Sequence, residues 1–237
     1  MAWWDQLDKD RFLQFHQEAL RERPDPFTPD NPCAAAHIIS SKVWFPFTTT
    51  LNDYAAFLAL STAYLESDRT GAPIESYTLG TTVLMWHAAI WEYIGQSINM
   101  LCDWIEDERK VSFESATEPQ MILGIDEARL MPIPKASLEE LAARLRSIWG
   151  STSVPRKIRN IGAHRYHIAN TYSQEFADLI KMKGRELHRE RLRRLQDNIK
   201  RSFNALIKAQ TELQTFLKTD SVRRWNRPWY QIKETEN

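Results

Sequence analysis

The spacing of apolar side chains constrains the fold more than any other feature of this sequence. Between residues 74 and 109, apolar side chains recur at steps of three and four, and the same steps run through residues 173–219. Steps of this size place side chains along one face of a helix. Alternation of apolar and polar residues, the pattern of strands, never extends beyond a few residues. The sequence therefore predicts an all-α protein, a multi-helix bundle with long amphipathic helices in which consecutive helices pack antiparallel.

Shorter stretches with the same period complete the predicted bundle. Further helices are expected at residues 3–22, 52–69, 137–149 and 154–168. Ser137 and Glu140 have the spacing of a capping box, which favours a helix start at Ser137. A heptad repeat in residues 173–219 is broken at Gly184 and Gln210, so a bundle helix is favoured over a coiled coil.

Prolines and lost periodicity mark the connections between these helices. The prolines closest to the N-terminus are Pro24, Pro26, Pro29 and Pro32. Because proline removes a backbone donor and restricts its neighbours, residues 23–50 are predicted to form an extended connection. Residues 110–136 are predicted to be a loop that holds one turn at most. We divide the chain into an N-terminal helix with its Pro-rich connection, a helical bundle and a basic, aromatic tail, at residues 1–50, 51–220 and 221–237.

Composition excludes several classes of protein. The chain has 237 residues with only 7 glycines, and it contains neither of the Gly-rich phosphate-loop motifs. Its two cysteines, Cys33 and Cys102, fit a reducing compartment and exclude a four-cysteine zinc site. The N-terminus lacks the basic and apolar regions of a signal peptide, and the most apolar stretch, residues 79–102, is interrupted by polar residues. These features favour a cytoplasmic protein without a membrane partner.

The charges are divided unevenly along the chain. Residues 1–134 carry 9 basic and 20 acidic side chains, a net charge of −11, whereas residues 135–237 carry 22 basic and 11 acidic side chains, a net charge of +11. Two interpretations stay open. The acidic half faces the basic half inside the fold, or the basic half binds a polyanion.

Residues 155–167 are the segment best suited to chemistry. They read Pro-Arg-Lys-Ile-Arg-Asn-Ile-Gly-Ala-His-Arg-Tyr-His, with four basic residues, two histidines and no acid. Fixed positive charge beside titratable imidazoles suits an anionic ligand, above all phosphate. RNA supplies its own nucleophile, the 2′-OH, so its cleavage needs a base, a donor for the leaving oxygen and positive charge at the phosphorane. Such a reaction needs no metal, and we expect no cofactor.

The core of this segment resembles a known family. Arg159 to His164, with Asn160 directly after the arginine, is similar to the R-x4-6-H signature of the HEPN superfamily. Tyr166 extends it to R-x4-H-x-Y, the form seen in HEPN toxins paired with a minimal nucleotidyltransferase antitoxin. The resemblance implies that residues 51–220 form an HEPN-like helical bundle. It implies a homodimer with a composite site that cleaves RNA without metal, as a toxin or in antiviral defence.

The resemblance also assigns a role to each residue of the motif. It implies Arg159 as phosphate clamp, Asn160 as orienting residue and His164 as general acid and base. It implies Tyr166 as the site of inhibitory adenylylation by such an antitoxin.

Other basic residues are candidates for binding the RNA backbone. They are Arg156, Lys157, Arg165 and His167 beside the motif, and Arg185, Arg189 and Arg193 in the last long helix. The basic run at residues 181–201 is interpreted either as a phosphate track or as a solvated helix face paired with Glu186 and Glu190.

Alternatives to a nuclease stay open on the sequence alone. The chain fits a non-catalytic HEPN-like module that binds RNA, a nucleotide or a protein partner, and it fits a scaffold in which the basic half only holds the acidic half. Residues 155–167 fit a basic helix start that pairs with the acidic run at residues 103–108. His164 and His167 have the spacing of two metal ligands, but no carboxylate lies close in sequence, so no metal site is predicted.

Overall fold

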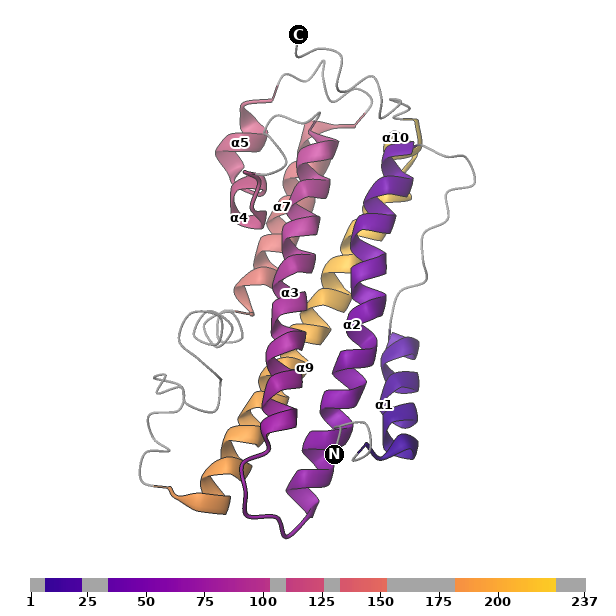
Figure 1. Cartoon of the computed structure of the whole chain (residues 1–237). Helices are drawn as coiled ribbons and strands as arrows, with labels where there is room; N and C mark the ends of the chain where they lie inside the picture. Colours follow the sequence, from indigo (N-terminus) through magenta and orange to yellow (C-terminus); the bar gives the residue numbers. More distant parts are fainter. Residues whose placement is uncertain (1–6, 23–33, 103–109, 126–132, 153–181, 225–237) are drawn as a thin grey trace. The chain divides into compact units, whose positions relative to one another are not determined.

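The structure is a computed structural model that describes residues 7–22, 34–102, 110–125, 133–152 and 182–224. Within these ranges every regular element is a helix, which confirms the predicted all-α class. The helices are α1 (Lys9–Glu22), α2 (Ala34–Glu66), α3 (Ile74–Leu101), α4 (Phe113–Ala116), α5 (Pro119–Leu123), α7 (Lys135–Gly150), α9 (Gly184–Leu217) and α10 (Asp220–Arg224) (Figure 1). None of these described helices combines the length and apolar character needed to cross a membrane.

The chain divides into two compact units, and α2, α3 and α9 each contribute residues to both. The first unit draws on Met1–Arg23, Thr48–Ala88 and Ser151–Ala205. The second unit draws on Pro24–Phe47, Ala89–Gly150 and Leu206–Asn237. Each unit therefore builds its core from segments that lie far apart in the sequence.

The core of the first unit joins α2, α3 and α9. Tyr54 of α2 stacks on Phe203 of α9, with ring centroids 4.0 Å apart. Gly80 of α3 allows close packing, since a Cβ there would lie 2.9 Å from the Cδ2 atom of Leu195. His87 of α3 is buried in this core and is only 2% exposed. The helical spacing in the sequence thus identifies the buried faces of this unit.

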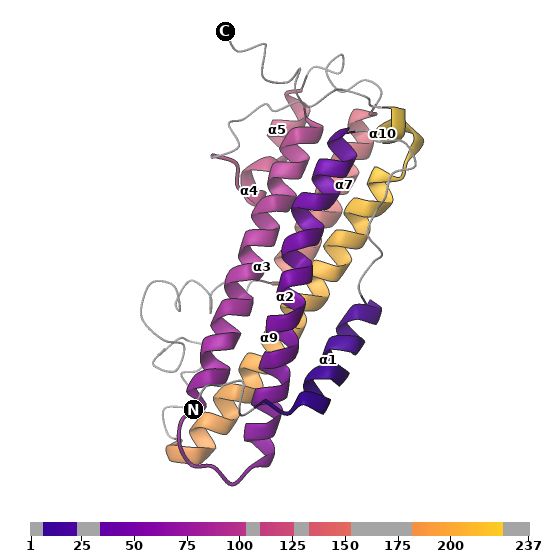
Figure 2. The same ribbon diagram turned by 45° about the vertical axis from the view of Figure 1, so that its right-hand side comes forward.

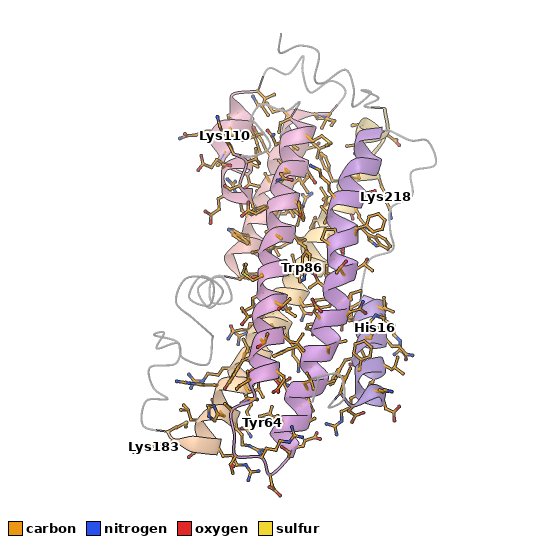
Figure 3. The ribbon with its side chains drawn as sticks, in the orientation of Figure 1. His16, Tyr64, Trp86, Lys110, Lys183 and Lys218 are labelled. Atoms are coloured by element: carbon orange, nitrogen blue, oxygen red, sulfur yellow. The ribbon has the colours of Figure 1, made fainter. Side chains whose placement is uncertain are left out.

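The short helix α1 lies alongside α2 within the first unit (Figure 1 and Figure 2). An ion pair joins Arg11 Nη2 to Glu66 Oε2 at 2.5 Å, at the end of α2. Asp8 Oδ1 accepts a hydrogen bond from the backbone N–H of Arg11 at 3.1 Å, which satisfies a free donor at the start of α1. Farther along α2, Asp53 accepts a hydrogen bond from the side chain of Trp86, which Figure 3 labels on α3.

The second unit is built on an aromatic cluster of Trp91, Phe113 and Trp149. The ring centroids of these residues lie 4.7 to 5.2 Å apart. Gly95 lets the chain at Phe113 approach α3, because a Cβ on this glycine would lie 2.7 Å from the Phe113 Cα. Glu92 Oε2 accepts the backbone N–H of Phe113 at 2.9 Å. Backbone as well as side chains therefore fix α4 to α3.

The predicted extended connection at residues 23–50 is wrong from Ala34 onward, where α2 begins and continues through Pro46. All four prolines used for that prediction precede residue 34. Val43 and Phe47 are 2% and 0% exposed and lie four residues apart, so they form one buried helix face. Burial of that face offsets the hydrogen bond that Pro46 removes, because most helix stability in proteins comes from packing.

The loop predicted at residues 110–136 contains two helices, α4 and α5. A capping box starts α4, in which the Ser112 side chain accepts the N–H of Ser115 and the Ser115 side chain accepts the N–H of Ser112. The capping box predicted at Ser137 and Glu140 is wrong, because α7 already begins at Lys135. Helices of four and five residues are too short to show a period in the sequence.

The last long helix begins later than its spacing predicts. In the described residues α9 starts at Gly184, whose φ is +56°, and residues 182–183 are not helical. Residues 173–181 of the predicted helix lie outside the described part. A positive φ is readily adopted by glycine alone, so Gly184 sets the direction in which the chain enters α9.

Candidate nucleic-acid interface

The predicted catalytic motif lies outside the described residues. This applies to Arg156, Lys157, Arg159, Asn160, His164, Arg165, Tyr166 and His167. Of the predicted site, the structure describes the three arginines of α9, Arg185, Arg189 and Arg193.

These three arginines line one groove in the first unit. They lie four residues apart, which places them on one side of α9, with one arginine for each turn. Met182, Glu186 and Glu190 complete the described lining of this groove, whose volume is about 450 Å³. We call it the arginine groove. Three cations and two carboxylates on one surface can bind an anion or pair with each other, and the contacts of each arginine distinguish these uses.

Arg185 and Arg189 both bind the end of α2. Arg185 Nη2 donates to the Ser67 carbonyl at 2.8 Å and pairs with Asp68 Oδ1 at 2.9 Å. Arg189 Nη1 donates to the same Ser67 carbonyl at 3.2 Å. The last carbonyls of a helix have no partner inside it, and cations stabilise that end. These two arginines therefore serve a structural purpose that neither interpretation of this run includes, because their partners lie at the end of α2 and are not Glu186 or Glu190.

Arg193 is the most exposed of the three. Its side chain is 55% exposed, and its contact with Glu190, at 3.7 Å between Nη1 and Oε2, is an ion pair within α9. Arg194 contacts the other oxygen of the same carboxylate, with Nε 3.1 Å from Oε1. Exposed pairs of this kind contribute little to stability. Arg193 is thus the arginine best placed to bind a ligand from solution.

The cations also affect the titratable groups around this end of the first unit. Burial raises the pKa of Tyr64, and the charges of Arg185 and Arg189 oppose that rise. The Tyr64 hydroxyl donates to the Gly71 carbonyl at 2.6 Å, near the end of α2 where Figure 3 labels it. Burial and the charge of Arg191 lower the pKa of His188, so its imidazole is neutral at pH 7.

Two further cations stabilise helix ends in the second unit. Arg146 Nη1 donates to the Thr117 carbonyl at the end of α4, at 2.6 Å. Lys135 Nζ donates to the carbonyl of Leu123 at the end of α5, and to that of Ile125 at 3.2 Å. As at Ser67, the donor belongs to the basic half of the chain and the carbonyl to the acidic half.

Sequence reasoning missed these contacts, and the sequence carries no specific signal for them. Helices α2, α4 and α5 have no basic residue in their last turns. Lysine and arginine are common at that position because they complement the helix dipole. The last turns of α3, α7 and α9 also lack basic residues, so this absence does not identify the helix ends that bind a distant cation.

Comparisons of the chain with protein-family models, with curated proteins and with solved structures find no match.

Proposed function

We propose that the chain is a metal-independent endoribonuclease of the HEPN type. The observation that carries the proposal is the motif Arg159-Asn160-x3-His164, set in a segment with no acidic residue in an all-α chain. The arginine groove supports it, since it presents exposed positive charge on the helix that follows the motif in the sequence. Phosphate contacts of this kind account for most of the affinity of proteins for nucleic acids.

The proposed reaction needs only groups from the chain and the RNA. Arg159 holds the scissile phosphate, and neutral His164 takes the proton from the 2′-OH. The O2′–P bond forms and the P–O5′ bond breaks, and the departing 5′ oxygen takes a proton from a protonated imidazole. That imidazole is supplied by the second protomer of a homodimer with a composite site. The products are a 2′,3′-cyclic phosphate and a 5′-hydroxyl.

The same motif suggests how the activity is controlled. A toxin or antiviral nuclease has to be held inactive until it is needed. Adenylylation of Tyr166 by a nucleotidyltransferase antitoxin would add a negatively charged group two residues from His164, which would repel the RNA phosphate. Modification of Tyr166 is therefore expected to abolish cleavage without unfolding the protein.

RNA cleavage in the presence of EDTA tests the proposed activity. We expect the wild-type chain to produce 2′,3′-cyclic phosphate ends, and Arg159→Ala and His164→Ala to lower the rate at least 100-fold, the usual minimum for loss of acid–base catalysis. Lys208→Gln, a charge change at an exposed position of α9 outside the groove and outside the basic run at residues 181–201, is the matched control and should cleave like the wild type. Chelator-sensitive cleavage, or full activity of His164→Ala, would contradict the mechanism.

A second candidate is a scaffold in which the basic half holds the acidic half. The contacts of Arg185, Arg146 and Lys135 with helix ends of the acidic half favour it. A scaffold would not bind RNA even at low salt. Salt-dependent binding without cleavage would instead identify a non-catalytic module.

A further inference from the structure

One carboxylate in the arginine groove is shared by two arginines. Glu190 Oε1 lies 3.1 Å from Arg194 Nε, and Glu190 Oε2 lies 3.7 Å from Arg193 Nη1. The Glu190 side chain is 30% exposed and forms part of the groove lining. Each of its two oxygens therefore faces a different guanidinium at a surface that solvent reaches.

A carboxylate between two guanidiniums resembles a phosphodiester in the same place. Both groups present two negatively charged oxygens, and guanidinium groups bind either of them through charge-assisted hydrogen bonds. We propose that the arginine groove binds a phosphodiester of single-stranded RNA, and that Glu190 occupies this phosphate site in the free protein and so limits its affinity. The inference rests on the proposed function for the identity of the polymer.

Arg193 is the residue that would release the Glu190 carboxylate and bind a phosphate in its place. Arg185 and Arg189 are held by the Ser67 carbonyl, so their guanidiniums contribute charge but stay at the end of α2. Arg193 has a side chain that is 55% exposed and a long contact to Glu190. Because an exposed ion pair is weak, Arg193 can leave Glu190 for a phosphate with little loss.

The arrangement favours a polymer over a free ion. Arginines four residues apart on a helix are separated by about 6 Å along its axis, so the three cations extend over about 12 Å. A single phosphate meets Arg193 alone, whereas an oligonucleotide also places neighbouring phosphates near the charges of Arg185 and Arg189. A polymer also gains from the release of counterions at each contact.

Binding of a single-stranded oligodeoxynucleotide to the full chain tests the inference. This probe has the same phosphodiesters as RNA but no 2′-OH, so it cannot be cleaved by the proposed reaction. We expect Glu190→Gln to bind about threefold to tenfold more tightly at low salt, because removal of a nearby negative charge strengthens phosphate binding. We expect Arg193→Gln to bind more weakly and to lower the salt slope by about one.

A double variant makes the test specific. If Glu190 acts by occupying Arg193, then Glu190→Gln should lose most of its effect when Arg193→Gln is also present. Lys208→Gln on the same helix is the control for simple loss of a positive charge, and thermal unfolding followed by circular dichroism checks that each variant folds. The inference is overturned if Glu190→Gln leaves affinity unchanged, or if Arg193→Gln weakens binding no more than Lys208→Gln.

Two further outcomes separate this inference from the proposed function. If the oligodeoxynucleotide binds as expected but RNA is not cleaved, phosphodiester binding in the groove is supported and the proposed nuclease activity is refuted. If RNA is cleaved through His164 but affinity for the oligodeoxynucleotide is independent of Glu190 and Arg193, the nuclease activity is supported and phosphodiester binding in the groove is refuted. Inorganic phosphate is the last probe. If it competes for the groove as well as an oligonucleotide does at the same phosphate concentration, the site binds a single ion and the proposed preference for a polymer is overturned.

Discussion

The two units use the same helix, α3, in different ways. In the first unit, a Cβ at Gly80 would meet the ends of side chains, the closest being Leu195 Cδ2 at 2.9 Å. In the second unit, a Cβ at Gly95 would meet the backbone of Phe113, at 2.7 Å from Cα and 2.8 Å from N. A side chain can rotate aside, whereas this backbone can move only if α4 moves with it. The first unit can therefore adjust to a methyl group at Gly80 more easily than the second unit can adjust to one at Gly95.

The largest effect is expected when α3 gains a methyl group in the second unit. Gly95→Ala should lower the free energy of unfolding by about 3 kcal/mol, the upper part of the range for overpacked cores. Gly80→Ala should lower it by about 1 kcal/mol, because side chains of the first unit can repack. Urea unfolding followed by circular dichroism measures both.

Gly150→Ala is the control for these two variants. Among the described residues, no atom beyond its chain neighbours and its own helix lies within 4 Å of a Cβ at Gly150, so this change should not lower stability. Equal losses at Gly80 and Gly95 would contradict the contrast between the two units.

The next effect concerns two helix ends that differ in the number of cations at one carbonyl. Among the described residues, one cation, Arg146, donates to the Thr117 carbonyl of the second unit, whereas two arginines donate to the Ser67 carbonyl of the first. Arg146→Met should lower the free energy of unfolding by about 1.5 kcal/mol, the low end for a hydrogen bond to a charged group. Arg144→Met, on the same helix, removes an exposed ion pair with Glu212 and should cost less than about 1 kcal/mol. A larger loss for Arg144→Met would contradict the structural role of Arg146.

A smaller effect is expected at the corresponding helix end in the first unit. Arg185→Met should lower the free energy of unfolding by only about 0.5 kcal/mol, since Arg189 still donates to the Ser67 carbonyl. The Arg185→Met, Arg189→Met double variant should lose more than the sum of the single losses, because it alone leaves that carbonyl without a cation. Strictly additive losses in urea unfolding would show that the two arginines do not substitute for each other.

The smallest effect is a dependence on pH in the first unit. Burial and the charge of Arg191 lower the pKa of His188 below its ordinary value of 6.5. The unfolded chain then binds a proton more readily than the folded chain, so stability is complete above pH 6.5 and falls as the pH drops through that value. His188→Gln should make the melting temperature less sensitive to pH between 7.5 and 5.5. An unchanged pH dependence would exclude His188 as its source.

Helices with a long, regular apolar face were predictable from the sequence. Residues 74–101 form α3, where buried side chains recur over 28 residues, enough for the period to stand out. Helices α4 and α5 were not predictable in this way, because they are held by the Ser112 capping box and by contacts with residues far along the chain. The start of α2 was misplaced, because prolines before residue 34 do not prevent a helix that begins after the last of them.

The candidate site was predicted only in part, for a similar reason. Charge and spacing indicated Arg185, Arg189 and Arg193 as a set, and the structure does place them in one groove. They did not indicate that two of the three bind the Ser67 carbonyl, because a backbone acceptor 118 residues away leaves no mark in the local pattern. The catalytic motif remains a prediction.

The distant cations at the ends of α2, α4 and α5 also bear on how the chain folds during its synthesis. While the first 134 residues leave the ribosome, they carry a net charge of −11 and lack the side chains that will stabilise three of their helix ends. Those helices become fully stabilised only after Lys135, Arg146 and finally Arg185 have been added. Final folding of both units must therefore wait until the residues of α9 have been translated. Until then, the net negative charge of the acidic segment opposes its aggregation.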